Sequence, residues 1–255
     1  MNIPIRLKAL LRLLLIAAGS YSFTSIIPAV AEPGAPRLDT VTGVLAAALL
    51  AILIYHAAER RRALLQTVNL ELNKLRRIYH LSKNLADIDN QRYRGWFTGM
   101  HGKLYDYMSA FADRDFHHYD DTNHAFRELS YHIYKVPELR SNKEESLYDE
   151  LLRTTAKVAE ARQQIKEANG SRLSSYAWVV VLLVVAGLAA TAALSAVDTV
   201  VSRAAAGTVI ACALFAVDLL WEVDTLGSEQ KEISMRYVEN IGRIELRRRS
   251  DESAA

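Results

Sequence analysis

AWVVVLLVVAGLAATAALSAV, residues 177–197, is followed after a short polar link by AAAGTVIACALFAVDLLW, residues 204–221. The first run has no charged side chain, and it has about the 20 residues that a helix needs to cross ~30 Å of hydrocarbon. The second is long enough to return if Val200 and Val201 are included. Within the hydrocarbon, the backbone N–H and C=O groups of such a hairpin can form hydrogen bonds only if both arms are helical. The sequence therefore predicts a transmembrane hairpin and an integral membrane protein.

The composition of the whole chain hides two populations of residues. The chain has 255 residues, of which 51% are hydrophobic, with very apolar ends and a strongly charged middle. Its net charge of only +2 gives no indication of nucleic-acid binding. Cys212 is the single cysteine, so no disulfide forms within the chain, and we expect it to serve packing.

The first apolar stretch follows Arg6 and Lys8 and allows two hypotheses. It could be a signal peptide with a small-residue cleavage site at 29–31, or a membrane helix over about Leu10–Val30. We favour the retained helix, because the run is long for a signal core. The prolines of residues 32–37 predict a loop after it.

The next apolar run, residues 38–56, is followed by Arg60, Arg61 and Arg62. Arginines directly after a span favour the cytoplasmic side. We therefore expect a multi-pass protein of the inner or plasma membrane with both termini and the central domain in the cytoplasm. The expected parts are an N-terminal hairpin (1–56), a cytoplasmic helical bundle (57–172), a C-terminal hairpin (173–222) and a basic tail (223–255). The arginine clusters, Arg60–Arg62 and Arg247, Arg248 and Arg249, are expected to contact anionic lipid.

The charged middle shows helical periodicity throughout. Apolar side chains at three-four spacing, beginning with Leu65, Val68, Leu72 and Leu75, define one face. No glycine or proline falls between Gly43 and Gly95, so the second span should continue as one helix of roughly 50 residues. We expect breaks at residues 89–95 and at Pro137, and a helix that opens with a capping box at Ser141 and Glu144 and ends near Gly170.

Amphipathic helices of this kind bury their apolar faces against one another, as a bundle or coiled coil. The aromatic side chains of residues 93–111 are expected in that core. The predicted fold is all-α: four transmembrane helices in two hairpins and a cytoplasmic helical bundle.

Four segments resemble the bestrophin-like domain family of small membrane proteins. They are LLQTVNLELNKLRRIY after the second span, the aromatic RYRGWFTGMHGKLYDYMSAF, LYDELLRTTAKVAEARQQI leading to SYAWVVVLL, and DLLWEVDTLG at the end of the fourth span. The resemblance implies a homo-oligomeric membrane protein that acts as an ion channel or regulates conductance, with inorganic ions and the bilayer as partners. The second or fourth span would line the pore. The opposing hypothesis is a non-conducting membrane scaffold or stress-response effector whose cytoplasmic bundle senses a signal.

Asp218, Glu222 and Asp224 are the candidate ion-pathway residues. A carboxylate within an apolar run is costly and should face a cavity or a partner. A ring of such groups at the inner pore mouth of an oligomer would favour cations. Alternatively the membrane helix ends near Val217 and these acids lie among the lipid headgroups.

His117, Asp121 and His124 are candidates for metal binding or pH sensing. On an α-helix their spacing places them along one face, as a metal site requires. A solvated face that titrates near neutral pH is the alternative. No phosphate-binding glycine loop, nucleophile with its base, or zinc motif occurs, so we expect neither an enzyme nor a cofactor.

Overall fold

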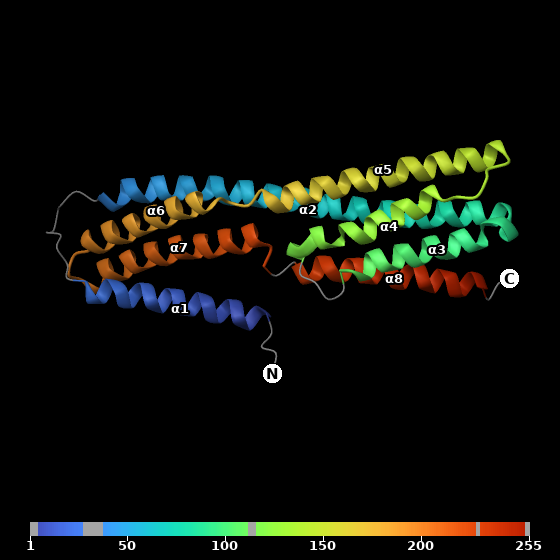
Figure 1. The fold of residues 1–255 in the computed structure, drawn as a ribbon. Helices are drawn as coiled ribbons and strands as arrows, with labels where there is room; N and C mark the ends of the chain where they lie inside the picture. The colour runs from blue at the N-terminus through green and yellow to red at the C-terminus, as the bar shows by residue number, and fades with distance from the viewer. Residues whose placement is uncertain (1–4, 28–37, 112–115, 228–229, 253–255) are drawn as a thin grey trace. The chain divides into compact units, whose positions relative to one another are not determined.

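The computed structural model describes residues 5–27, 38–111, 116–227 and 230–252, and within these ranges it contains helices and no strand (Figure 1). This confirms the predicted all-α class. The elements are α1 (Ile5–Ile26), α2 (Leu38–Ile88), α3 (Asn90–Ser109), the 3-10 helix η1 (Phe116–Thr122), α4 (Asn123–Tyr134), α5 (Asn142–Gly170), α6 (Ser175–Leu194), α7 (Val200–Thr225) and α8 (Gln230–Glu252).

The chain divides into two compact units. The apolar unit contains residues 1–59 and 172–225, and the polar unit contains residues 60–171 and 226–255. Helix α2 is continuous over 51 residues and contributes to both units, as its uninterrupted sequence predicted.

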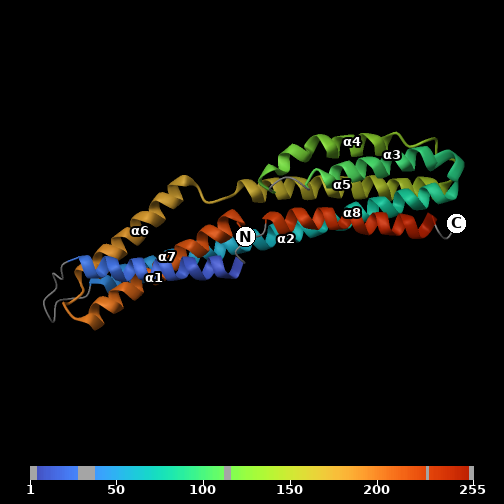
Figure 2. The same cartoon turned by 90° about the horizontal axis from the view of Figure 1, so that it is seen from below.

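The apolar unit is formed by α1, the first part of α2, α6 and α7. Its core combines Ala46 and Leu50 of α2 with Val181 of α6 and Leu220 of α7, all of them buried. Helix α7 lies beside both α6 and α1 (Figures 1 and 2). A β-carbon added at Gly207 of α7 would lie only 3.4 Å from the α-carbon of Tyr21, so α1 approaches α7 closely at this glycine.

Three helical stretches in the described part of the chain are long and apolar enough to cross a membrane: Thr40–Ile88, Asn142–Leu194 and Val200–Gly242. In α1 the corresponding apolar part is shorter, Leu11–Ile26. The helix α1 begins at Ile5, earlier than the predicted Leu10, and the end predicted at Val30 lies outside the described residues. Ser20 and Thr24 of α1 are buried in the apolar unit, so these polar side chains are covered by other helices.

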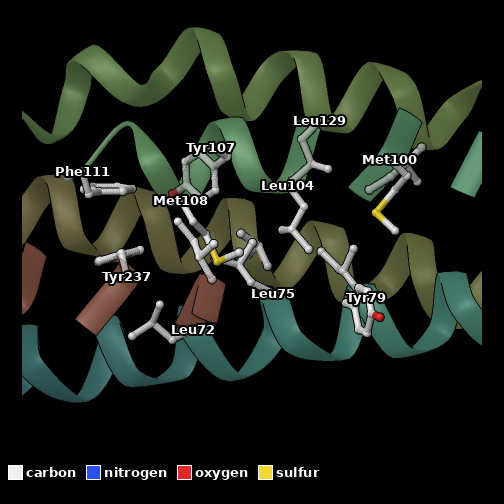
Figure 3. Close-up of a cluster of buried hydrophobic side chains, with 14 of the residues drawn as sticks. Leu72, Leu75, Tyr79, Met100, Leu104, Tyr107, Met108, Phe111, Leu129 and Tyr237 are labelled. Carbon is white, nitrogen blue, oxygen red and sulfur yellow. The ribbon is translucent and has the colours of Figure 1, made fainter. Parts of the chain in front are cut away.

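The polar unit packs α3, η1, α4, α5, α8 and the second part of α2 around one hydrophobic core. Figure 3 shows Leu72 and Leu75 of α2 beside Leu104 and Met108 of α3, with Tyr237 of α8. The expected aromatic core is largely confirmed, because Tyr93, Trp96, Tyr107 and Phe111 are buried and Phe97 is partly buried. Tyr105 is 42% exposed.

Local sequence signals explain the helix ends. The side chain of Asp89 accepts a hydrogen bond from the backbone N–H of Arg92 at 3.2 Å and caps α3, while Gly95 lies inside that helix and breaks nothing. Ser141 caps α5 by accepting from the N–H of Glu144 at 3.3 Å. The carboxylate of Glu144 accepts from the N–H of Arg140 at 2.6 Å, one residue before the position that a capping box requires.

The C-terminal segment differs most from expectation. Instead of a simple basic tail, residues 230–252 form α8, which packs against α3 and η1. Ile233, Tyr237 and Ile241 are buried at a spacing of four residues and join the core of the polar unit. The last helix is therefore an integral part of this unit.

Candidate functional site

Asp218 lies on α7 and faces α1. The Nη1 atom of Arg12 is 3.5 Å from its Oδ1 atom, and the two side chains are 61% and 38% exposed. An ion pair this exposed is normally weak, at about 0–1 kcal/mol in water. Sequence reasoning singled out Asp218 and missed its partner, although Arg12 stands out as a cation beside an apolar run.

Glu222 and Asp224 follow Asp218 on the last turns of α7. Glu222 is half-buried. Asp224 is only 3% exposed, and its Oδ1 atom accepts a hydrogen bond from the backbone N–H of Leu173 at 3.1 Å. Asp224 therefore fixes the segment that enters α6. Trp221 of α7 and Trp178 of α6 meet edge to face, with ring centroids 5.3 Å apart.

Arg203 holds the opposite end of the α1–α7 pair. Its Nη1 atom donates to the carbonyl oxygen of Ser25 at 2.8 Å and its Nη2 atom donates to Asp198 at 2.9 Å. The carbonyl oxygen of Arg203 in turn accepts from the hydroxyl of Thr24 at 3.3 Å. Because Arg12 and Ser25 contact opposite ends of α7, the two helices run antiparallel.

An apolar cavity of about 420 Å³ lies in the apolar unit between α2, α6 and α7. Gly43, Ala47, Leu188, Cys212 and Ala216 are among its lining residues. Two of the lining residues have polar side chains. The hydroxyl of Thr208 donates to a backbone carbonyl of its own helix, and the thiol of Cys212 is only weakly polar. Among the described residues that line the cavity, none is charged.

The most elaborate polar cluster surrounds Glu71, in the polar unit. Glu71 is completely buried, and its carboxylate accepts hydrogen bonds from three tyrosine hydroxyls, each on a different element. Tyr119 of η1 donates at 2.8 Å, Tyr237 of α8 donates at 2.6 Å, and Tyr107 of α3 also donates. The pKa of Tyr107 is raised well above its ordinary value. Burial is the larger cause, and the negative charge of Glu71 is the next. Tyr107 therefore remains a donor.

Arg162 of α5 supplies the compensating positive charge. Its Nη1 atom is 3.8 Å from the carboxylate of Glu71 and donates to the hydroxyl of Tyr107. Its Nη2 atom donates to Thr122 at 3.1 Å and to Asn123 at 2.7 Å. A buried ion pair is tolerated only when its remaining polar atoms are also satisfied. Here both carboxylate oxygens of Glu71 and both terminal nitrogens of Arg162 have hydrogen-bond partners. The cluster joins α2, α3, η1, α4, α5 and α8 through side chains.

A second cluster in the polar unit surrounds Glu144. Its carboxylate accepts from Arg92 at 2.6 Å and from the hydroxyl of Tyr93 at 2.9 Å. Burial, followed by the hydrogen bond to Glu144, raises the pKa of Tyr93 to about 12. The contacts tie the start of α3 to the start of α5, so this cluster has an evident structural role.

The histidine candidates are arranged differently from the predicted helix face. Residues 116–122 form a 3-10 helix and α4 begins only at Asn123, so His117 and Asp121 do not occupy one α-helical face. The side chain of His117 lies outside the described residues. Among the side chains that the structure describes, no group of three or more His, Cys, Asp and Glu could hold a metal ion. Metal binding or pH sensing by His117, Asp121 and His124 stays a prediction.

The predicted basic anchors are partly engaged within the protein. Arg60 donates to the carbonyl oxygen of Ser171 at 2.8 Å, Arg61 is half-buried and Arg62 is exposed. The side chains of Arg247, Arg248 and Arg249 lie outside the described residues. Their contact with lipid also stays a prediction.

The long apolar helices and the polar helical unit together define an all-helical membrane protein. A family model described as the Bestrophin-like domain matches residues 38–223, and the chain belongs to this family. The resemblance seen in the sequence is thereby confirmed.

Several solved structures share the fold. Two mutant structures of a Bestrophin homologue from Klebsiella pneumoniae match at 11% and 12% identity, with TM-scores of 0.64 and 0.63. They cover 92% and 93% of this chain and 99% and 98% of theirs. A structure described as a membrane protein matches at 12% identity and a TM-score of 0.61, covering 92% of this chain and 99% of its own. A comparison with curated proteins gives no match.

Proposed function

We propose that this protein is an ion channel of the Bestrophin-like family that acts as a homo-oligomer. One observation carries the proposal: the family model spans residues 38–223, from the start of α2 to the last turns of α7. The structural likeness to the Klebsiella pneumoniae homologue extends this support to almost the whole chain at the level of the fold. The sequence contains none of the catalytic motifs that we looked for, and neither the Glu71 cluster nor the Glu144 cluster indicates catalysis.

The proposed topology has four spans in two hairpins. The first pair is α1 with the first part of α2, and the second pair is α6 with α7. The polar unit and both termini lie on the cytoplasmic side, where Arg60, Arg61 and Arg62 follow the second span. The close packing of α1 on α7 at Gly207 supports α1 as a membrane helix of the folded protein. The corresponding parts of the chain are residues 1–56, 57–172, 173–222 and 223–255.

The proposed ion pathway passes the carboxylates at the end of α7. Asp218 is partly exposed within an apolar helix, and a charge in that position is favourable only beside water, an ion or another charged group. Glu222 lies one turn further along the same helix. Asp224 is held by the N–H of Leu173, so its role in the pathway would be to fix the mouth rather than to contact ions.

Ion flux in proteoliposomes containing the purified full-length protein tests this function. Chloride and potassium gradients are applied separately to wild type, Asp218→Asn and the matched control Glu160→Gln, an exposed carboxylate of α5. We expect wild type and the control to conduct alike and Asp218→Asn to change the preference between the ions. Tight vesicles containing well-folded oligomers would instead support the scaffold hypothesis.

Topology and assembly are tested separately. A fluorescent protein fused after Ala255 should fluoresce, because that fold forms in the cytoplasm, whereas alkaline phosphatase fused at the same place should be inactive. The mass of the detergent-solubilised particle, corrected for detergent, should be an integral multiple of 28.5 kDa greater than one. A monomeric particle would contradict the proposed homo-oligomer.

A further inference from the structure

Asp218 and Trp221 lie where α7 leaves the hydrocarbon in the proposed topology. Helix α7 begins at Val200, and Val200 and Asp218 are about 27 Å apart along it at ~1.5 Å per residue. This length nearly equals the ~30 Å thickness of the hydrocarbon. Trp221 follows about one turn after Asp218 and is 53% exposed, as is typical of tryptophans among the lipid headgroups. The end of α7 therefore lies at the level of the lipid phosphates of the inner leaflet.

Arg12 of α1 brings a positive charge to the same level. Its Nη1 atom is 3.5 Å from the Oδ1 atom of Asp218, and 61% of the Arg12 side chain and 38% of the Asp218 side chain are exposed. A guanidinium carries several N–H donors, and at this exposure some of them face outward, where a ligand can accept from them. Glu222 adds a second carboxylate one turn after Asp218. The surface thus presents donors for a phosphate directly beside acceptors for a cation.

An exposed apolar strip of α1 continues from Arg12 into the membrane. Leu15 and Gly19 follow Arg12 at spacings of three and seven residues, so the three residues lie on one face of the helix. Leu15 is 72% exposed, and a β-carbon added at Gly19 would meet no atom within 4 Å. The acyl chain of a lipid whose headgroup is bound at Arg12 can therefore lie along this face.

The charges at this surface distinguish between phospholipid headgroups. A glycerol headgroup leaves the lipid anionic and places its phosphate near the carboxylates of Asp218 and Glu222 without a compensating cation. A choline group cannot donate a hydrogen bond to a carboxylate, because its nitrogen is fully methylated. An ethanolamine group ends in an ammonium with three N–H donors, and two carbons join it to the phosphate. Of these three headgroups, ethanolamine alone can form a charge-assisted hydrogen bond at both positions.

We propose that Arg12 and Asp218 form a binding site for an ethanolamine phospholipid of the bilayer, with the phosphate at Arg12 and the ammonium group at Asp218. The proposal rests on the proposed four-span topology, and it does not depend on which helices line the ion pathway. Arg12 lies outside the family match, which begins at residue 38. Arg203 holds the other end of α1 through the carbonyl of Ser25, so neutral side chains at positions 12 and 218 should leave α1 packed.

Native mass spectrometry of the full-length protein tests the proposal. The protein is released from nanodiscs that contain equal amounts of phosphatidylethanolamine, phosphatidylcholine and phosphatidylglycerol, and the lipids that stay bound are counted. Wild type should retain the ethanolamine lipid about two- to fivefold more than either other lipid, the size expected for one partly exposed charge. Arg12→Gln should reduce the retention of ethanolamine and choline lipids alike, because both lose the contact to the phosphate. Asp218→Asn should remove the preference for ethanolamine over choline, and the control Arg153→Gln, on an exposed position of α5, should behave like wild type.

Equal retention of the three lipids by wild type, or a preference for phosphatidylglycerol, would overturn the proposal. Unchanged lipid counts in Arg12→Gln would do the same, as would an unchanged ratio of ethanolamine to choline lipid in Asp218→Asn. If Arg12→Gln does not fold, Asp218→Asn decides alone through that ratio. The measurement needs no current and no orientation of the protein. Failure of the channel function in the flux assay, or of the topology in the fusion assay, is therefore distinguishable from failure of the lipid site.

Discussion

Removing the hydroxyl of Tyr237 isolates the hydrogen bond that holds α8 to the buried carboxylate. In Tyr237→Phe the ring can still stack on Phe111, whose centroid is 3.9 Å away, so packing is preserved. Glu71 loses the donor at 2.6 Å and keeps Tyr107, Tyr119 and Arg162. Hydrogen bonds to charged groups contribute about 1.5–3 kcal/mol, and we expect a loss of stability near the lower end.

The same cluster predicts an order of effects among variants. Glu71→Gln removes the counter-charge of the buried Arg162 and should cost about 3–5 kcal/mol, more than Tyr237→Phe. The control Tyr148→Phe removes a hydroxyl that lies 3.5 Å from the carbonyl of Ile133, at the limit of a hydrogen bond. It should change stability by less than about 0.5 kcal/mol.

Hydrogen exchange followed by mass spectrometry measures the opening of α8 directly. Peptides covering residues 230–242 should exchange about tenfold faster in Tyr237→Phe than in wild type, since ~1.4 kcal/mol corresponds to a factor of ten. The midpoint of thermal unfolding should fall by at least about 3 °C. Unchanged exchange of these peptides, or a smaller effect of Glu71→Gln than of Tyr237→Phe, would refute the view that the carboxylate anchors α8.

Two further predictions concern α3. Gly99→Ala should destabilise the protein by about 1–3 kcal/mol in thermal unfolding, because its β-carbon would lie 2.5 Å from the ring of His132. That ring is held in place, since its Nε2 atom donates to the carbonyl oxygen of Trp96 at 2.8 Å. Gly102→Ala on the same helix has free space and should be neutral or stabilising. Stability should also fall as pH rises from 10 toward 12, because Tyr93 stays protonated in the folded state while the unfolded side chain ionises. In Tyr93→Phe this part of the alkaline loss, measured as the unfolding midpoint against pH, should be absent.

The membrane helices and the long α2 could be predicted because their signals are local. Uninterrupted apolar runs define α6 and α7, and the lack of helix breakers after Gly43 predicts a single helix to Ile88. The capping residue Ser141 likewise marked the start of α5 one residue before its first helical position. Each of these depends only on neighbouring residues.

The buried clusters could not be predicted in the same way. Glu71 stands on the apolar face between Val68 and Leu75, which signals a buried acid, yet its partner Arg162 is far away in the sequence. Only the packing of several helices brings the two charges together. The pairing of Arg12 with Asp218, across nearly the whole chain, was hidden for the same reason.

The C-terminal helix was missed although its signal was present. Ile233, Tyr237 and Ile241 follow a four-residue spacing, but the surrounding charge makes the segment read as a basic tail. In η1, the burial of Phe116 and Tyr119 at a three-residue spacing suits a 3-10 helix and displaced the α-helical face expected for the histidines.

Cys212, the single thiol of the chain, is exposed on α7 at the lining of the apolar cavity. A fluorophore coupled to it would therefore mark every subunit once, without any substitution in the protein. The number of photobleaching steps in a single particle would then equal the number of chains in the assembly. Slow or incomplete coupling in assembled particles, compared with dissociated ones, would show that neighbouring chains meet along this face of α7.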